Sequence, residues 1–385
     1  MAAVPTLTAE GVERATPPAD APVAEVAAGV TRVGHALAER ATTTNWVCSP
    51  LSLAYAFAMA RAGAGGETAE EIDRVLGFPE VGTHAAFNAI SRQAATDHVR
   101  VANGLFTQHG LPVSAEFLAT LATHYGTGVH PVDFARDGAE IINSWVRDST
   151  AGRIPRLFDA LSPATRLVLA NAIYLKAPWR HPFAEGETTH EHFAAAGGPV
   201  RVPMMHLTAD LAYAAGPDWQ AVELPYKGAD LAMRLVVPAD DQAPDALLAP
   251  DLLAAVTRSL VPTYVGLAMP RFDYGSHIDL VPPLMSLGLR TVFGPEADLG
   301  GIHPGLRVDG AVQRATITVD EWGTEAAAAT GLMMLTSMRQ PPTTVVSADV
   351  PFAFTITHTP TGVPLFAGVV GDPSDTKGGR QPPPR

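Results

Sequence analysis

An apolar run, RLVLANAIYLKAPW, lies in the middle of the chain at residues 166–179. Apolar residues stand side by side in this run instead of alternating with polar ones, so both faces of an extended segment would be buried. A strand buried on both faces lies in the interior of a sheet that is covered on both sides. The run therefore predicts a long central strand.

Helical patterns dominate before this run and strand patterns after it. The predicted helices are one with Val23, Val26, Val30, Val33 and Leu37 on one face, one that opens at Ser49-Pro50 and runs to Met59, one with the capping box Thr68-Ala69-Glu70-Glu71, and one over Ala139–Asp148. Further predicted strands cover residues 220–225, 231–238, 264–270, 315–321, 352–358 and 365–370. Helices followed by strands, rather than alternating units, predict an α+β fold.

The two ends differ in composition from the rest of the chain. Residues 1–22 are rich in Ala, Pro and Thr, and we expect them to be disordered, like the tail at residues 374–385. Residues 23–373 contain no repeat and no low-complexity linker, which predicts a single domain. The start lacks a basic segment followed by an apolar one, and no apolar run could span a bilayer, which predicts a cytoplasmic protein. A mature secreted form would look the same, so an extracellular location stays open.

Charge and motifs exclude several classes of function. The formal net charge of −13 argues against nucleic acid and anionic membrane surfaces as partners. The single cysteine, Cys48, allows no intrachain disulfide and lies in an apolar run, where we expect a buried, inert thiol. The chain has no G-x-S-x-G or H-E-x-x-H motif, and His190-Glu191-His192 lies in what reads as a polar loop. We predict no metal, no cofactor and no enzyme activity; a hydrolase ranks third, because a catalytic triad is assembled in space.

The segment after residues 315–321 has an ambiguous structure. Trp322 and Gly323 lead to an alanine run at residues 326–329, and Pro341-Pro342 follow. Alanine is the best helix former, so propensity alone favours a helix or a plain surface linker.

A family resemblance changes that interpretation. Glu321-x-Gly323 followed by Thr-Glu-Ala-Ala-Ala-Ala-Thr resembles the hinge of the reactive-centre loop of serpins. Other segments resemble serpin motifs in the same order, over roughly residues 25–373: Asn45-x-x-x-Ser49-Pro50-x-Ser52, Asn171-Ala-Ile-Tyr-Leu-Lys-x-x-Trp179-x-x-x-Phe183, Val202-Pro-Met-Met205, Glu223-Leu-Pro-Tyr226, Met269-Pro-Arg-Phe272, Ala297-Asp-Leu-x-Gly301-Ile302, Pro351-Phe352-x-Phe354 and Leu365-Phe366-x-Gly368.

The resemblance implies both a fold and a function. The fold would be a large central, mostly antiparallel sheet with smaller sheets, about eight or nine helices and an exposed reactive-centre loop at about residues 323–342. The function would be irreversible inhibition of a serine protease, which cleaves the loop, forms an acyl-enzyme and is trapped as the loop inserts into the main sheet. A non-inhibitory serpin that binds or carries a ligand is the alternative. We expect a monomer that can polymerise by loop–sheet insertion.

The resemblance also assigns residues to three regions. The hinge is Glu321, Gly323, Thr324, Glu325, Ala326, Ala327, Ala328, Ala329 and Thr330. The shutter, where polar side chains bridge the strands that part, is Ser49, Ser52, Asn171 and Gln313. The breach, where insertion begins, is Trp179, Arg271 and Glu321. Serpins usually have a histidine at the position of Gln313 and a charged residue at that of Trp322.

The reactive bond follows from a count along the loop. Serpins usually place the scissile residue sixteen positions after the hinge glutamate, which gives Ser337–Met338, with Met338–Arg339 and then Arg339–Gln340 as alternatives. Ser337 or Met338 favours a subtilisin-, elastase- or chymotrypsin-like protease, whereas Arg339 would favour a trypsin-like one. The side chains that would point inward on insertion carry no charge, which is compatible with burial. They are Thr324, Ala326, Ala328, Thr330, Leu332, Met334 and Thr336.

Overall fold

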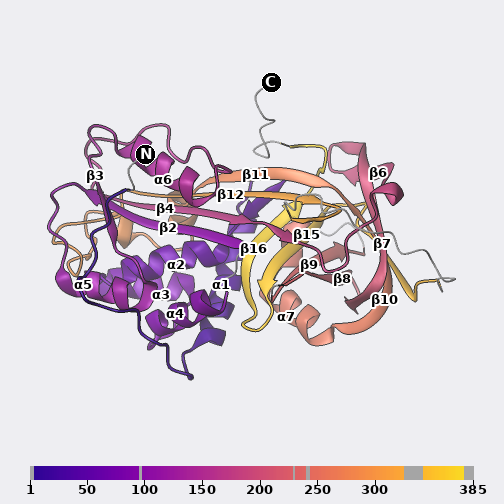
Figure 1. Cartoon of the computed structure of the whole chain (residues 1–385), viewed down its shortest axis with the longest axis horizontal. Helices are drawn as coiled ribbons and strands as arrows, with labels where there is room; N and C mark the ends of the chain where they lie inside the picture. Colours follow the sequence, from indigo (N-terminus) through magenta and orange to yellow (C-terminus); the bar gives the residue numbers. More distant parts are fainter. Residues whose placement is uncertain (1–3, 95–97, 229, 240–242, 325–340, 377–385) are drawn as a thin grey trace.

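The computed structural model describes residues 4–94, 98–228, 230–239, 243–324 and 341–376. Two large sheets hold these residues together, with helices on both faces of one of them (Figure 1). The eight α-helices among the described residues are α1 (Val23–Ala38), α2 (Pro50–Arg61), α3 (Gly66–Leu76), α4 (Thr83–Gln93), α5 (Ala115–Thr120), α6 (Gly138–Ser149), α7 (Pro250–Ser259) and α8 (Val281–Ser286). Short irregular helices are η1 (Leu121–Tyr125), η2 (Glu185–Glu187), η3 (Pro244–Leu248) and η4 (Thr291–Phe293).

Within the described residues the first sheet has seven strands, in the order β3-β2-β4-β12-β13-β5, with β11 paired to the other side of β12. Its strands are β2 (Val99–Gln108), β3 (Val129–Val132), β4 (Leu167–Leu175), β5 (Ala177–Pro178), β11 (Phe272–Asp279), β12 (Gly310–Asp320) and β13 (Gly323–Thr324). The two central strands, β4 and β12, are parallel, while β4 is antiparallel to β2 and β12 to β11.

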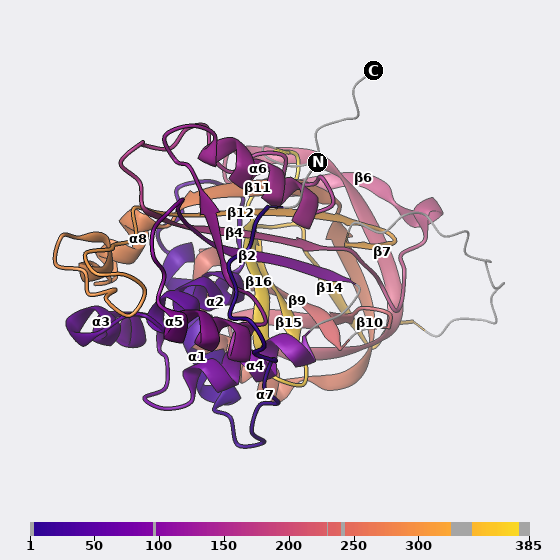
Figure 2. The ribbon, with the colours of Figure 1, turned by 60° about the vertical axis from the view of Figure 1, so that its left-hand side comes forward.

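The predicted central strand is confirmed. All nine residues of β4 are buried, because the sheet is covered by α6 on one face and by α2 on the other (Figures 1 and 2). Lys176 separates β4 from the two-residue strand β5, so the apolar run continues within the same sheet.

The second sheet has nine strands in the part of the chain that the structure describes, in the order β1-β16-β15-β9-β8-β7-β10-β14, with β6 paired to β7. Its strands are β1 (Trp46–Cys48), β6 (Thr189–Ala195), β7 (Gly198–Ala215), β8 (Trp219–Pro225), β9 (Leu231–Pro238), β10 (Val261–Pro270), β14 (Thr344–Ser347), β15 (Phe352–His358) and β16 (Val363–Val370). The segment around His190-Glu191-His192 is therefore strand β6 and not the polar loop that we predicted. Its polar residues Thr189–His192 are exposed or half-buried in succession, because β6 lies at the border of the sheet and pairs with β7; burial alternates only from Phe193 to Ala195.

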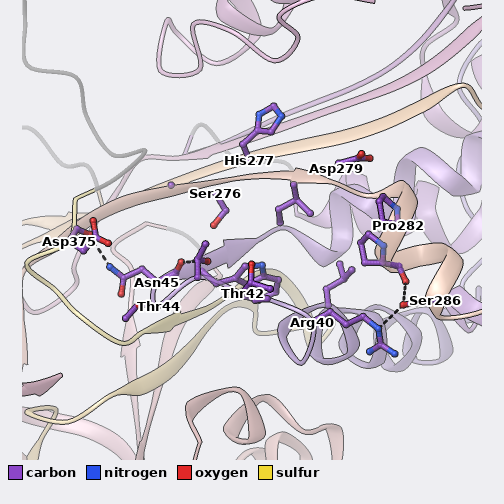
Figure 3. Close-up of a pocket in the computed structure, with 17 residues that line it drawn as sticks. Arg40, Thr42, Thr44, Asn45, Ser276, His277, Asp279, Pro282, Ser286 and Asp375 are labelled. Atoms are coloured by element: carbon purple, nitrogen blue, oxygen red, sulfur yellow. Dashed lines mark hydrogen bonds between the residues drawn. The ribbon is translucent and has the colours of Figure 1, made fainter. Parts of the chain in front are cut away.

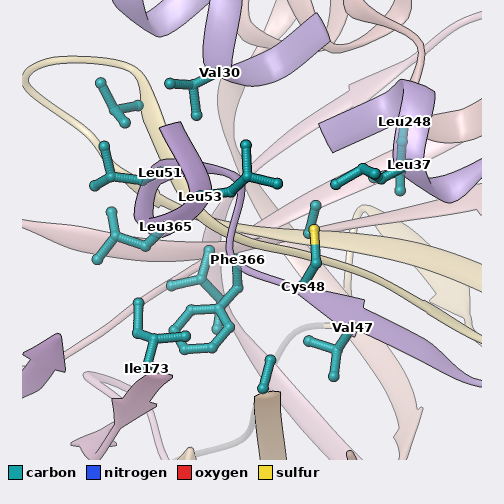
Figure 4. Close-up of a cluster of buried hydrophobic side chains, with 14 of the residues drawn as sticks. Val30, Leu37, Val47, Cys48, Leu51, Leu53, Ile173, Leu248, Leu365 and Phe366 are labelled. Carbon is teal, nitrogen blue, oxygen red and sulfur yellow. The ribbon is translucent and has the colours of Figure 1, made fainter. Parts of the chain in front are cut away.

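The main core lies where the two sheets and helices α1 and α2 meet. Figure 4 shows Val30 and Leu37 of α1, Leu53 of α2 and Ile173 of β4 in this cluster. Cys48 is fully buried in the same cluster, as predicted, and burial raises the pKa of its thiol.

The start of α2 follows the prediction, but the start of α3 does not. Ser49 caps α2 by accepting a hydrogen bond from the Ser52 amide at 3.2 Å. Helix α3 begins at Gly66, two residues before the predicted cap Thr68. The hydroxyl of Thr68 instead accepts from the Asp298 amide at 2.9 Å, so a tertiary contact uses the oxygen that would cap the helix.

The N-terminal segment corrects another prediction. Residues 4–22, which we expected to be disordered, lie against the domain: Leu7 and Val129 exchange backbone hydrogen bonds at 2.8 and 3.1 Å. The Arg14 side chain donates to Asn88 Oδ1 at 2.9 Å. The exposed edge of β3 and a polar helix surface supply partners that composition does not reveal.

The first residues of the predicted C-terminal tail also correct the prediction of disorder. Residues 374–376 are described, and the carbonyl of Asp375 accepts from the Asn45 side chain at 2.9 Å. Residues 377–385 lie outside the described part of the chain. Within that part, no helix is long and apolar enough to cross a membrane.

Candidate functional site

The candidate site lies at one end of the seam between the paired strands β4 and β12, just beyond Ile173 and Ala315; we call this the upper end. The two strands pair in parallel from Val168/Gly310 to Ile173/Ala315. Beyond these residues they part, and β13 lies between them, antiparallel to β12 on one side and to β5 on the other. The first two hinge residues after the chain reverses, Gly323 and Thr324, therefore already belong to the sheet.

Gly323 occupies a position that other residues cannot take. A Cβ atom at this site would lie 2.2 Å from the carbonyl oxygen of Ala177 and 2.7 Å from the Cα of Pro178. Both atoms belong to the backbone of β5 and cannot move aside cheaply. The close approach of β13 to β5 thus requires glycine here.

The reversal between β12 and β13 is held by side chains on both sides. Asp320 Oδ1 accepts from the amides of Trp322 and Gly323 at 2.9 and 3.2 Å. The indole of Trp322 donates to Glu185 Oε1 in η2 at 2.9 Å. This contact gives a structural reason for tryptophan where serpins usually have a charged residue: the indole N–H fixes the turn to η2.

Two of the predicted breach residues form an ion pair beside this turn. The Arg271 guanidinium donates to Glu321 Oε1, from Nε at 2.8 Å, and the Thr188 hydroxyl donates to the same oxygen. Glu321 is 1% exposed. Burial raises the pKa of Glu321, but the hydrogen bonds from Arg271 and Thr188 outweigh it, so the pKa is lowered and the carboxylate stays charged.

Trp179, the third predicted breach residue, lies on the other side of the turn. Its indole donates to the carbonyl of Asp320 at 3.0 Å, and its amide donates to the carbonyl of Trp322 at 2.9 Å. Its ring stacks on Tyr226, with centroids 4.6 Å apart and an angle of 15° between the planes.

The predicted shutter residues meet further along the seam, where β4 and β12 are paired with each other. Gln313 and Asn171 face each other across β12 and β4, and Gln313 Nε2 donates to Asn171 Oδ1 at 2.5 Å. Gln313 also bonds to both backbone groups of Ser49, accepting from N at 2.7 Å and donating to O at 2.9 Å.

Ser52 takes part in a different way from the one we expected. Its backbone carbonyl accepts from Asn171 Nδ2 at 2.7 Å, whereas its hydroxyl is buried without a hydrogen-bond partner in the described residues. Asn171 also donates to Asn103 of β2, so one series of amides runs from α2 through β12 and β4 to β2.

The rest of the predicted loop lies outside the described residues. This applies to the hinge residues Glu325, Ala326, Ala327, Ala328, Ala329 and Thr330, and to the candidate reactive-bond residues Ser337, Met338 and Arg339.

Sequence reasoning missed three residues at this site. Tyr226 OH and Thr324 Oγ1 share a buried hydrogen bond of 2.6 Å, Thr188 binds Glu321, and Asn103 binds Asn171. Tyr226 stands in one of the motifs that carried the resemblance, but nothing in the local pattern indicates its partner. The other two lie in segments without any motif.

A sizeable cavity lies away from this site. It has a volume of about 710 Å³ between the loop after α1, strand β11 and helix α8, and none of the predicted site residues lines it (Figure 3). Arg40 and Ser286 both line it, and Arg40 donates a hydrogen bond to the Ser286 hydroxyl at 2.8 Å. Among the described residues no group of three or more His, Cys, Asp or Glu side chains could hold a metal ion.

Comparisons with known proteins show the family and the fold. Residues 30–373 match the family model described as "Serpin (serine protease inhibitor)". An uncharacterized serpin-like protein of Thermococcus kodakarensis is 36% identical over 343 residues, covering 85% of this chain and 80% of its own. The leukocyte elastase inhibitor of Bos taurus is 34% identical over 360 residues, covering 88% and 95%. A solved structure of thyroxine-binding globulin in complex with thyroxine has a TM-score of 0.81 and 26% identity, covering 92% of this chain and 99% of that one.

Proposed function

Because the chain belongs to the serpin family and has the serpin fold, we propose that it is an irreversible inhibitor of serine proteases that traps its target by loop insertion. The observation that carries the proposal is the upper end of the seam, where β4 and β12 part and Gly323 and Thr324 already lie between β5 and β12. A strand that continues from Thr324 would run down this seam. The relative named leukocyte elastase inhibitor supports an inhibitory role.

The topology of the seam suits insertion. The loop leaves β12 through a reversal, so a strand that enters beside β12 runs antiparallel to it and also to β4. One parallel ladder would be replaced by two antiparallel ladders, which are slightly more stable per residue. The segment from Thr324 to Ser337 has fourteen residues, which would span roughly 46 Å when extended. An acylated protease would be carried across most of the inhibitor.

The proposed roles of the site residues follow from their contacts. The ion pair of Arg271 with Glu321 and the indole of Trp179 would fix the turn from which insertion starts. The shutter amides of Gln313 and Asn171 would keep β4 and β12 together until cleavage. We propose Ser337–Met338 as the reactive bond and a subtilisin-, elastase- or chymotrypsin-like protease as the partner, with a trypsin-like one if the bond is Arg339–Gln340.

The direct test is incubation with subtilisin, elastase, chymotrypsin and trypsin. At least one should form a complex that survives SDS, and the mass of the released C-terminal peptide locates the cleaved bond. Cleavage should also raise the melting temperature, because the loop becomes a strand. Cleavage by all four proteases with no complex and no gain in melting temperature would contradict the proposal.

A pair of hinge variants tests insertion itself. Side chains alternate between the two faces of a strand, so an arginine at Ala328 would be buried on insertion, whereas an arginine at Ala327 would face outward. Ala328→Arg should turn the inhibitor into a substrate that is cut without trapping. Ala327→Arg, the matched control, should still trap the protease.

The second candidate is a non-inhibitory binding protein. It is favoured by one observation, the structural similarity to thyroxine-binding globulin, which was solved in complex with thyroxine. Cleavage of the loop would then leave the melting temperature unchanged, which separates the two functions in the same experiment.

A further inference from the structure

We propose that Tyr226 is a positioning residue that holds Thr324 in the sheet of the uncleaved protein. Insertion would then start from a seated strand, by which we mean that Gly323 and Thr324 are already paired with β12 and β5. The first observation is the hydrogen bond of 2.6 Å between Tyr226 OH and Thr324 Oγ1. Tyr226 is fully buried and Thr324 is 1% exposed. A hydrogen bond in such a place is expensive to lose, because either oxygen would be left buried without a partner.

The tyrosine is itself held rigidly. Its amide donates to the carbonyl of Leu231 at 2.9 Å, and the neighbouring amide of Lys227 donates to the carbonyl of Pro178 at 2.8 Å. Its ring stacks on Trp179, whose indole and amide bind the turn at Asp320 and Trp322. The hydroxyl therefore has one fixed position, which lies beside the side chain of Thr324, the last hinge residue that the structure describes.

The hydroxyl also stays protonated at neutral pH. Burial raises the pKa of Tyr226, and the hydrogen bond with Thr324 offsets only part of this increase. Tyr226 can therefore serve as donor or acceptor to Thr324 without change across the neutral range.

The glycine before Thr324 gives independent support. Only glycine allows the backbone of β13 to approach the Ala177 carbonyl oxygen as closely as it does, since a Cβ atom would lie 2.2 Å from that oxygen. The residue types at Gly323 and Thr324 both fit the seated position: one removes a steric clash and the other supplies a hydrogen bond. The position of β13 in the sheet is thus specified by two neighbouring residues, Gly323 and Thr324, and by a third residue, Tyr226, far away in the sequence.

The expected consequence concerns the period after cleavage. An inhibitor must insert its loop before the acyl-enzyme is hydrolysed. When the first two residues of the loop are already paired in the sheet, the first step of insertion is complete before cleavage. Without the Tyr226 hydroxyl the strand unseats more often, insertion starts later, and more molecules are cut as substrate. This consequence rests on the proposed function, whereas the seating of Thr324 in the uncleaved protein does not.

Amide hydrogen exchange of the uncleaved protein tests the seating directly. The Thr324 amide should be protected in the native chain, and Tyr226→Phe should speed its exchange at least roughly fivefold, as expected for a lost buried hydrogen bond. The matched control is Tyr274→Phe: Tyr274 is also fully buried, and its hydroxyl donates to the Val369 carbonyl at 2.9 Å, away from the hinge. It should leave exchange at Thr324 unchanged.

Two hinge variants guard against a folding defect in Tyr226→Phe. Thr324→Ser keeps the hydroxyl and should keep the protection, whereas Thr324→Val, of similar shape, should lose it. Tyr226→Phe combined with Thr324→Val should cost less than the two single changes added together, because no polar atom is left unpaired. Fast exchange at Thr324 in the native protein, or equal exchange in Thr324→Ser and Thr324→Val, would overturn the proposal.

Trapping is then measured as the number of inhibitor molecules consumed per protease molecule trapped. Tyr226→Phe and Thr324→Val should raise this number severalfold, and Tyr274→Phe should not. If even the unchanged chain traps no protease, the proposed function fails while the exchange experiment still decides the seating. If exchange responds as expected but trapping does not, Tyr226 holds Thr324 without positioning it for insertion, and the proposal is wrong on that point.

Discussion

Replacing Gln313 by leucine should weaken the seam between β4 and β12 specifically. The side chain is fully buried and makes three hydrogen bonds, two to the backbone of Ser49 and one to Asn171 Oδ1. Leucine has a similar size but no polar atoms. The Ser49 carbonyl keeps a second partner, the Leu53 amide at 3.2 Å, so the groups left unpaired are the Ser49 amide and Asn171 Oδ1. At about 1–3 kcal/mol for each, the native state should lose roughly 2–6 kcal/mol.

The loss should fall mainly on the native state. Neighbouring strands lie about 4.8 Å apart, so a strand inserted between β4 and β12 would move Gln313 and Asn171 to about twice that separation. Their hydrogen bond would therefore be broken in the inserted form of either protein. If about 1–3 kcal/mol of the loss is absent from the transition state for opening, opening becomes roughly fivefold to a hundredfold faster.

The assay follows the loss of inhibitory capacity during incubation without protease, together with native gels that separate monomer, inserted monomer and polymer. Melting temperatures are measured for native and cleaved protein. The matched control is Asn143→Leu, because Asn143 also makes three buried hydrogen bonds, all of them to residues 157 and 158 and none across the seam. It should destabilise native and cleaved protein alike. Equal conversion rates for the two variants, or an equal drop of both melting temperatures in Gln313→Leu, would refute the reasoning.

Three further predictions concern pH and the C-terminal segment. The pKa of Glu321 is lowered, so its contribution to stability is complete above pH 4.5 and is lost as the pH falls below that value. Glu321→Gln should therefore make the urea concentration at the unfolding midpoint depend less on pH over this range. Burial and the neighbouring His124 lower the pKa of His84 from 6.5 to about 4, so up to about 3 kcal/mol of stability should be lost as the pH falls through this interval, and His84→Gln should remove that slope in urea titrations. Asn45 Oδ1 accepts from the amides of Gly371 and Asp372 at 2.9 Å, so Asn45→Ala should speed trimming by carboxypeptidase, measured by mass spectrometry.

The sequence predicted those parts of the fold that depend on burial and local chemistry. The apolar run at residues 166–179 specified β4 because only a covered central strand accommodates it. Ser49-Pro50 specified the start of α2 because a cap and a first-turn proline act within four residues. The shutter residues were found through motifs, and the structure brings Gln313 and Asn171 into contact.

Contacts between distant segments could not be predicted in this way. The local pattern at Thr68 predicted a helix cap, and the composition around Leu7 predicted disorder. In the structure Thr68 instead accepts a hydrogen bond from the Asp298 amide, and Leu7 pairs with the edge of β3. Tyr226 and Thr324 are separated by 98 positions, and neither residue type indicates a bond to the other. A side-chain hydroxyl or an unpaired strand edge accepts many partners, so only the folded geometry selects one.

The two ends of the seam should respond to mutation in opposite directions. In the proposed mechanism the amides of Gln313 and Asn171 keep the lower seam closed, while Tyr226 and Gly323 keep the first hinge residues inside its upper end. Loss of Gln313 lowers the barrier to opening, so Gln313→Leu should speed conversion without protease. Loss of the Tyr226 hydroxyl unseats the strand that must enter, so Tyr226→Phe should slow that same conversion. The double variant should convert at an intermediate rate, and a double variant that converts faster than Gln313→Leu alone would mean that Tyr226 restrains insertion instead of preparing it.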